Sequence, residues 1–227
     1  MIFRMLILTF ILACLGVYSW LNPVMQRQVE DFHLDKVNNQ GQAIEPWQGP
    51  WACVADKNTG LLWEVKRDDE SIHDGYWTYS WFDGRKGIPN RGDCYFEQER
   101  CDVDDLIRRA NQLKTCGVDD WRLPTTEELN SIVSFAIRPG EPTINKDYFP
   151  HSKKGDYWSM DADRPLTGIF AHLKTGARAV NFSDGKAVVL PYRNAAFVRL
   201  VSDARFSKTK LASFHPEIII PDNFLDR

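Results

Sequence analysis

The sequence predicts an α+β domain in which two helices accompany short antiparallel strands and long loops. Two stretches in the middle of the chain have the apolar spacing of helices, and short strand-like segments with turn residues between them follow in residues 157–203. Of the 227 residues, 43% are hydrophobic and 26% are charged, which is the balance of a globular protein. The chain is therefore long enough for one domain with additional segments.

Residues 102–115 give the strongest helix prediction. Their apolar side chains recur at helical spacing and form one stripe, made of Val103, Leu106, Ile107, Ala110 and Leu113. Acidic residues at the start of this segment favour the positive end of the helix dipole. Cys116 and Gly117 are expected to end the helix.

A second helix is expected after Pro124. Thr125 and Glu128 have the spacing of a capping box, in which each side chain accepts a hydrogen bond from the other residue's backbone N–H. The predicted buried face consists of Leu129, Ile132, Val133 and Ala136, and Pro139 with Gly140 should close the helix. Before both helices, residues 52–56 and 61–66 are predicted to pair as a hairpin around a turn at 57–60.

The N-terminal segment, residues 1–21, is apolar apart from Arg4 and predicts export. It has the length of an apolar helix that anchors the chain in a membrane through residues 2–21. Val17 and Ser19 also suit cleavage as a signal peptide, and Cys14 suits a lipoprotein, so these three alternatives stay open. Residues 22–50 are interpreted as a linker, residues 51–203 as the folded domain and residues 204–227 as a surface tail.

Four cysteines follow the leader, and an even number in an exported chain predicts two disulfides with three alternative pairings. Cys94 and Cys101 lie close in the sequence with polar residues between them, which favours a local bridge. Cys53 and Cys116 would then join an early strand to the end of the first helix. A zinc site is disfavoured, because the cysteines form no Cys-x-x-Cys pair and no His lies near them.

Catalytic and metal motifs are not recognisable. The five His residues are scattered, and the chain has neither a Gly-x-Ser-x-Gly elbow nor an HExxH motif. We therefore expect no enzyme, no cofactor and no metal, although a hydrolase with two carboxylates needs no motif. Calcium is the remaining metal alternative, because Asp161 and Asp163 are spaced as alternate ligands. The net charge of −3 argues against a nucleic-acid binder.

Two sets of residues are candidates for ligand binding. Trp77, Tyr79 and Trp81 share one face if residues 76–82 are extended, and that face either stacks on a sugar or belongs to the core. Residues 151–210 carry a net charge of +6, although such charges commonly pair with acidic parts of the fold. From this stretch we predict Lys153, Lys154, Lys174 and Arg178 as contacts to an anionic ligand.

Several motifs resemble the Lcl C-terminal domain family, a bacterial family of unknown function named after a collagen-like adhesin. They are TGLLWEVK at 59–66, CGVDDWRLPTTEELNSIV at 116–133, YWS at 157–159, VNFSDG at 180–185 and FVRLV at 197–201. The resemblance covers about residues 52–203 and implies a C-type-lectin-like fold. The named member is implicated in binding sulfated glycans, whereas most members have no assigned ligand.

The motif residues are interpreted as structural rather than as a binding site, because each has a packing or capping task. This set contains Trp63, Trp121, Arg122, Pro124, Thr125, Glu128, Trp158 and Arg199. Arg122 is expected to pair with a carboxylate or backbone carbonyls. Arg199 lies between apolar neighbours in a predicted strand, so its side chain is expected to point outward.

Together these observations predict an exported binding module of the bacterial cell envelope, tethered to the inner membrane or released to the surface. Its expected partner is an anionic glycan, and the alternative is another envelope protein in an assembly. Carboxylate-based glycan hydrolysis is the least favoured function.

Overall fold

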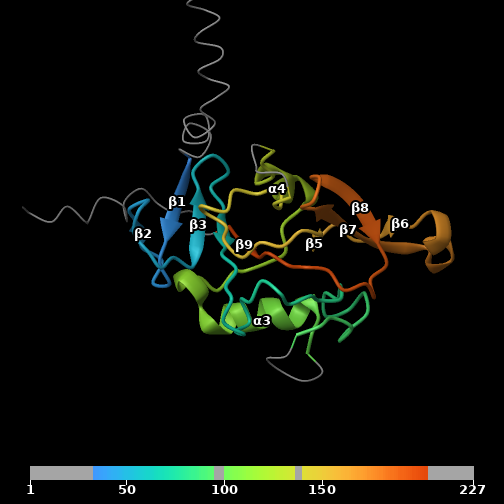
Figure 1. Cartoon of the computed structure of the whole chain (residues 1–227). Coiled ribbons are helices and arrows are strands. Elements are labelled where there is room, and N and C mark those ends of the chain that lie inside the picture. Colours follow the sequence, from blue (N-terminus) through green and yellow to red (C-terminus); the bar gives the residue numbers. More distant parts are fainter. Residues whose placement is uncertain (1–32, 95–99, 136–139, 204–227) are drawn as a thin grey trace, which may run out of the picture.

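The computed structural model describes residues 33–94, 100–135 and 140–203, and these confirm an α+β architecture. The leader at 1–21 with its predicted apolar helix and Cys14, the tail at 204–227 and the predicted helix residue Ala136 lie outside the described residues. Two antiparallel sheets lie side by side, and Figure 1 shows α3 and α4 on opposite sides of the strands.

The first sheet has five strands in the order β2-β1-β3-β4-β9. These strands are β1 (Leu34–Val37), β2 (Ala43–Ile44), β3 (Cys53–Asp56), β4 (Leu62–Glu64) and β9 (Val201–Ser202). The interpretation of residues 22–50 as a linker is wrong for its described part, because β1 pairs along the whole of β3. The strand β1 is difficult to recognise in the sequence because it contains polar residues and buries only Leu34 and Val37.

The predicted hairpin at residues 52–66 is confirmed as β3 and β4. The turn is organised by the carboxylate of Asp56, which accepts hydrogen bonds from the backbone N–H of Asn58 and the hydroxyl of Thr59. Gly60 closes the turn with φ +76°, a conformation that glycine adopts without strain.

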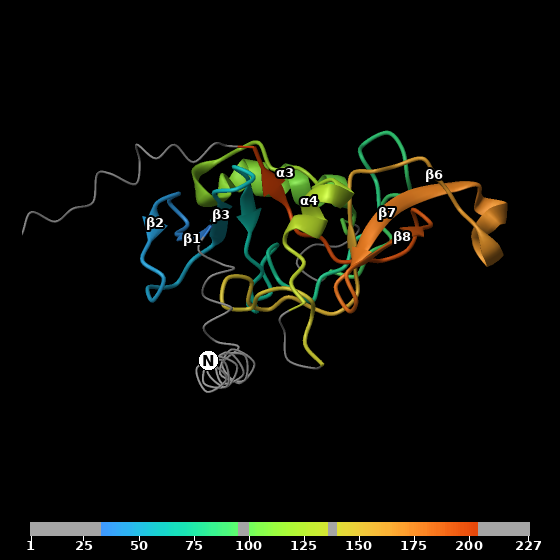
Figure 2. The ribbon, with the colours of Figure 1, turned by 90° about the horizontal axis from the view of Figure 1, so that it is seen from above.

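The second sheet is built on its longest strand, β7 (Thr175–Asn181). One side of β7 pairs with β5 (Asp156–Trp158) and β6 (Arg164–Pro165), and β8 (Lys186–Leu190) also pairs with β7. Between β6 and β7 lies the 3-10 helix η2 (Gly168–Leu173). Figure 2 shows that β6 and η2 project from the body at the end opposite β2.

Both predicted helices are present. The first, α3 (Val103–Leu113), is capped by the side chain of Asp102, and a short 3-10 helix η1 (Thr115–Gly117) follows it. The second, α4 (Thr126–Ser131), has the predicted capping box between Thr125 and Glu128. It ends earlier than the apolar pattern predicts, and two residues past its C-cap the N–H of Ser134 donates to the carbonyl of Thr143.

Both disulfides are formed in the predicted pairing, Cys53–Cys116 and Cys94–Cys101. The first joins β3 to η1 across 63 residues of sequence, whereas the second closes a short loop before α3. In the chain-entropy account a loop of the larger size contributes roughly 4 kcal/mol to stability.

Glu64 is a fully buried carboxylate that ties distant segments together. Its Oε1 accepts from Lys66 Nζ at 2.8 Å and from His73 Nδ1 at 2.7 Å, and its Oε2 accepts from the backbone N–H of Leu200 at 2.9 Å. Burial by itself raises the pKa of Glu64, but the Lys66 ammonium and the His73 hydrogen bond outweigh that effect and hold the pKa at about 2.

Arg199 belongs to the same cluster, so the expectation that its side chain points outward is wrong. The side chain is fully buried, and burial lowers the pKa of its guanidinium. Its Nη1 donates to the backbone carbonyl of Glu64 at 2.5 Å and its Nη2 donates to Ser152 Oγ at 2.6 Å. The structural role assigned to Arg199 therefore takes the form of a buried cross-link between segments.

We predict that Glu64→Gln lowers the free energy of unfolding by about 3–5 kcal/mol at pH 7, because it leaves the Lys66 ammonium buried without its counter-charge. The folded-state pKa lies below the ordinary value of 4.5, so the ionised carboxylate stabilises the fold above about pH 5. That contribution of about 3 kcal/mol is lost as the pH falls toward 2.

Urea denaturation followed by tryptophan fluorescence between pH 3 and pH 7 measures both effects. Glu127→Gln, at an exposed position of α4, is the matched control and should behave as the unaltered chain. An acid-induced loss of stability of the same size in Glu64→Gln and in the unaltered chain would contradict the assignment.

Candidate functional site

The three aromatic residues predicted to face a ligand lie in the core instead. Trp77, Tyr79 and Trp81 are 8%, 0% and 3% exposed, so the alternative of core packing holds and the proposed stacking face does not exist. Their polar atoms are satisfied internally, since Trp77 Nε1 donates to the carbonyl of Ser71 and Trp81 Nε1 to that of Ser159. Other parts of the fold cover the face that these three residues share, whereas Tyr76, just before them, is 62% exposed.

The four predicted basic residues do not form one surface. Lys174 comes directly before β7, whereas Lys153 and Lys154 precede β5, whose Asp156 pairs with Asn181 at the far end of β7. The length of β7, at ~3.3 Å per residue, separates the two ends by about 20 Å. Arg178 lies between them and is half-buried, and the Lys153 ammonium lies 3.2 Å from the centre of the Tyr76 ring.

The motif residues have the structural tasks expected of them. Arg122 makes two hydrogen bonds to Glu128 and two to Asp203, which joins the start of α4 to the end of β9. These carboxylates raise the pKa of Arg122. The aromatic members Trp63, Trp121 and Trp158 are buried in the core, as is Pro124.

The two aspartates considered for calcium have other partners. Asp161 accepts from the backbone N–H and the hydroxyl of Thr126, and Asp163 pairs with Lys86 and Tyr192. Within residues 33–94, 100–135 and 140–203 the structure contains no group of three or more His, Cys, Asp or Glu side chains arranged to hold a metal ion.

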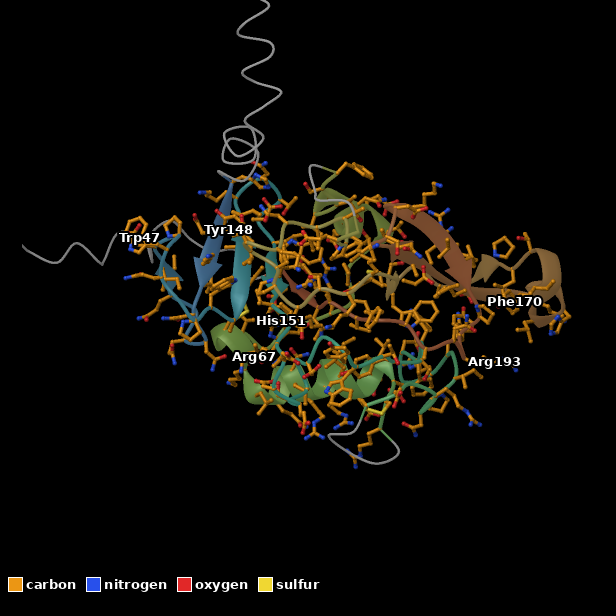
Figure 3. All side chains as sticks on the ribbon, in the orientation of Figure 1. Trp47, Arg67, Tyr148, His151, Phe170 and Arg193 are labelled. Carbon is orange, nitrogen blue, oxygen red and sulfur yellow. A yellow bond between two sulfur atoms is a disulfide. The ribbon has the colours of Figure 1, made fainter. Side chains whose placement is uncertain are left out.

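A groove of about 1280 Å³ lies at the β1–β2 end of the molecule. It is bounded by the β1–β2 turn, the segment before β3, the segment after β4, and Pro150 with His151. Figure 3 shows Trp47 at the outer edge of this region, with Arg67 and His151 closer to the middle of the molecule. Hereafter "the groove" means the surface formed by Asn38–Gln40, Ile44, Trp47–Ala52, Val65–Asp69 and Pro150–His151.

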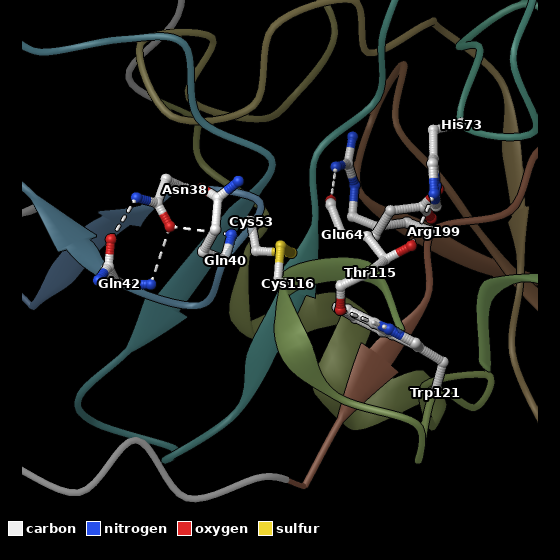
Figure 4. The surroundings of a disulfide bond; sticks show 10 residues. All are labelled: Asn38, Gln40, Gln42, Cys53, Glu64, His73, Thr115, Cys116, Trp121 and Arg199. Carbon is white, nitrogen blue, oxygen red and sulfur yellow. Dashed lines mark hydrogen bonds and ion pairs between the residues drawn. A yellow bond between two sulfur atoms is a disulfide. The ribbon is translucent and has the colours of Figure 1, made fainter. Parts of the chain in front are cut away.

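One wall of the groove is the turn between β1 and β2. Asn38 Oδ1 accepts from the backbone N–H groups of Gln40 and Gln42, which holds the turn in shape. Gly41 adopts φ +78°, and a Cβ at that position would lie 2.5 Å from the carbonyl oxygen of Cys116. The Cys53–Cys116 disulfide fixes the position of Cys116 beside this turn, and Figure 4 shows the disulfide together with Asn38 and Gln40 of the turn.

Trp47 is presented to solvent by a four-residue turn. The N–H of Gln48 donates to the carbonyl of Glu45 at 2.9 Å, and Gln48 Oε1 accepts from the N–H of Glu45 at 3.0 Å. Pro46 occupies the second position of the turn, where its fixed φ is favourable. Trp47 at the third position is 80% exposed, so nearly the whole of its indole ring is open to solvent.

Trp51 is held in place on the same side of the groove. Its Nε1 donates to the carbonyl of Tyr148 at 2.9 Å, and the ammonium of Lys36 lies 3.8 Å from the centre of its ring. Lys36 also donates to the carbonyl of Pro46, so it connects the Trp51 ring to the turn that carries Trp47. Burial lowers the pKa of Lys36, although Asp147 opposes this effect.

The floor and the far wall of the groove come from residues 65–69 and 150–151. Lys66 contributes to the floor but its ammonium is paired with Glu64, whereas Arg67 pairs with Asp69 at 3.6 Å. His151 adopts φ +56°, an uncommon conformation for a residue with a side chain. Its carbonyl oxygen would lie 2.3 Å from a Cβ at position 75, so only glycine there permits the approach.

The groove offers the chemistry of a polar binding site with an aromatic edge. It combines an exposed indole, the amides of Asn39 and Gln40, the guanidinium of Arg67 and the carboxylate of Asp68. Residues of both charge signs therefore line it. Sequence reasoning missed this site because it assigned residues 22–50 to a linker, although Trp47 within that segment was a signal.

We predict that Gly41→Ala destabilises the fold by more than about 2 kcal/mol, because it adds a backbone clash to the strain of a positive φ. Gly60→Ala is the matched control, because Gly60 has φ +76° and open space around it. It should cost about 1 kcal/mol in urea denaturation. Equal losses in the two variants would show that Cys116 does not restrict the turn.

Searches of curated proteins and of solved structures each find no match. The two disulfides indicate that the chain folds in an oxidising compartment outside the cytosol. In the part of the chain that the structure describes, no helix has the length and apolarity required to cross a membrane.

The family model described as the Lcl C-terminal domain matches residues 52–202, which is most of the chain and nearly the whole of the described fold. The match includes both disulfides, both helices and the strands from β3 to β9. It excludes β1, β2 and the turn that carries Trp47. By this match over more than half of its length, the chain belongs to the Lcl C-terminal domain family.

Proposed function

We propose that this protein is an exported, non-enzymatic binding module of the bacterial cell envelope, which holds a glycan chain in the groove on a C-type-lectin-like scaffold. Residues 2–21 would tether it to the inner membrane, with the folded domain in the periplasm. The single observation that carries the proposal is Trp47, an 80% exposed indole on a stabilised turn at the edge of the groove.

The shape and lining of the groove support a glycan. Its volume of about 1280 Å³ is above the usual range for small-molecule pockets, about 300–1,000 Å³, and suits an extended chain of sugars. An exposed indole stacks on the apolar face of a sugar ring. Amide and carboxylate side chains such as Asn39, Gln40 and Asp68 can exchange hydrogen bonds with sugar hydroxyl groups.

The charge of the groove bears on the kind of glycan. Arg67 and His151 share the lining with Asp68 and Asp69, so charge alone does not select a sulfated chain. An acidic sugar would be bound through Arg67, whereas the separated lysines at 153, 154 and 174 would each make at most a peripheral contact. We therefore propose a glycan in which stacking and hydrogen bonds contribute more than net charge.

A binding role is favoured over hydrolysis by the placement of the acidic residues. Glycosidases place two carboxyl groups on opposite sides of the bond that they cleave. The two carboxylates in the groove, Asp68 and Asp69, are neighbours on one wall. Burial by itself raises the pKa of Asp69, but hydrogen bonds from Ser71 and the charge of Arg67 outweigh burial and lower that pKa. A lowered pKa opposes the use of Asp69 as a general acid.

We predict that Trp47→Ala weakens glycan retention about 10-fold, the loss expected when one stacked aromatic ring worth about 1.5 kcal/mol is removed. Binding of the purified chain to a panel of envelope and sulfated oligosaccharides, measured by surface plasmon resonance, checks this. The melting temperature should not change, because Trp47 has little buried surface to lose.

Two controls make the result specific. Leu113→Ala removes another exposed apolar side chain, at the end of α3, and should leave retention unaltered. A triple variant with Lys153, Lys154 and Lys174 changed to Glu separates the groove from the basic residues. If the triple variant loses retention on sulfated resin and Trp47→Ala does not, the groove is not the binding site.

A further inference from the structure

A second surface, independent of the groove, lies at the opposite end of the molecule. The arm, defined here as residues 164–176, consists of β6, η2 and the start of β7. Figures 1 and 2 both show it projecting beyond the rest of the fold, and Figure 3 labels Phe170 on this arm. Because the groove and the arm lie at opposite ends, one can be occupied without blocking the other.

The tip of the arm is apolar, with Ile169 exposed and Phe170 half-buried. The 3-10 helix η2 has the sequence GIFAHL, and none of its residues is buried. Ile169 is 83% exposed, the largest value among the exposed large apolar side chains of the described chain. An exposed apolar side chain with a half-buried aromatic ring beside it, on an element that projects from the body, offers an apolar surface to a partner.

The base of the arm is fixed to the second sheet. Arg164 and Pro165 pair with Gly176 and Thr175, and the N–H of Leu166 donates to the carbonyl of Lys174. A Cβ at Gly176 would lie 2.0 Å from the carbonyl oxygen of Leu190, so this glycine allows β8 to pack closely against the base. The tip is therefore held out from the body by paired strands.

Two exposed cations flank the tip, and Asp161 and Asp163 lie just before the first of them in the sequence. The sequence contains no Asp or Glu between Arg164 and Ser183, whereas Arg164, Lys174 and Arg178 lie in that stretch. Arg164 and Lys174 flank η2 on its two sides and both are exposed. The arm thus has an apolar end with cationic side chains behind it, the arrangement of elements that bind the interfacial region of an anionic membrane.

We propose that the arm docks on the surface of an anionic lipid bilayer, with Ile169 and Phe170 entering the headgroup region and Arg164 and Lys174 contacting lipid phosphates. A sulfated glycan would satisfy the two cations but would leave the apolar tip in water. A lipid surface accounts for both features, because apolar side chains enter the acyl boundary while Lys and Arg remain at the headgroups.

The test uses the full chain in lipid nanodiscs, because its apolar N-terminal segment could bind lipid by itself. Hydroxyl-radical footprinting reports each side chain separately. In discs containing phosphatidylglycerol, oxidation of Ile169 and Phe170 should fall several-fold relative to discs of phosphatidylcholine alone. Leu113 and Phe135, exposed apolar residues outside the arm, serve as internal references and should not change.

Arg164→Glu combined with Lys174→Glu should abolish the protection. Each basic residue near an anionic surface changes affinity about fivefold, so loss of both contacts weakens docking by roughly 30-fold. Lys146→Glu, an exposed cation outside the arm, is the matched control and should retain protection. Near-ultraviolet circular dichroism confirms that each variant is folded.

Protection that is lost at high salt and in the double variant supports the proposal. Equal oxidation of Ile169 and Phe170 in both kinds of disc overturns it, as does protection of the arm by heparin in the absence of lipid. Retained protection in Arg164→Glu/Lys174→Glu would equally overturn the assignment of these two cations.

Discussion

The carboxylate of Glu64 is the constraint on which the rest of the structure depends. It is fully buried, yet it stays ionised because Lys66, His73 and the backbone N–H of Leu200 all donate to it. An ionised carboxylate can only accept hydrogen bonds, so His73 Nδ1 must carry a hydrogen. Through Arg199 and the contact of His73 with Thr115, the cluster joins β4, the 67–76 loop, the segment before β9 and η1. Segments distant in sequence therefore have one shared electrostatic centre.

That centre also positions the groove. Lys66 faces Glu64 with its ammonium and contributes its chain to the groove floor, so the floor is fixed by an ion pair that a ligand does not have to displace. Cys116 lies one residue from Thr115 and supports the β1–β2 turn through its contact with Gly41. The polar core, the longer disulfide and the rim of the groove are thus connected to one another by direct contacts. The arm, by contrast, is held by the strand pairing of the second sheet.

Local features were predictable from the chain because their physics acts over a few residues. The capping box of Thr125 and Glu128, the hairpin around Gly60 and the Cys94–Cys101 bridge each involve residues close in sequence. The predictions that failed concern side chains that are buried by segments distant in the sequence. Trp77, Tyr79 and Trp81 alternate as a half-exposed strand would, but Ala196 and Asp93 pair on either side of this segment and bury it. The expected direction of Arg199 failed for the same reason, since alternation gives a period but not the side that is covered.

The sequence by itself determined the α+β class, the two helices, the capping box of α4, the local Cys94–Cys101 bridge and the resemblance to the family, since these follow from short-range spacing and motif order. Only the tertiary structure decided that β1 and β2 join the domain and that a groove with Trp47 in its lining forms there. It also decided that Lys153 and Lys154 lie at the opposite end of β7 from Lys174. The physical reason is that a groove and a charged surface are properties of juxtaposed segments. Which segments come together depends on the burial of groups that are distant in the sequence, above all those of the Glu64 cluster. Such burial leaves no periodic pattern in the sequence.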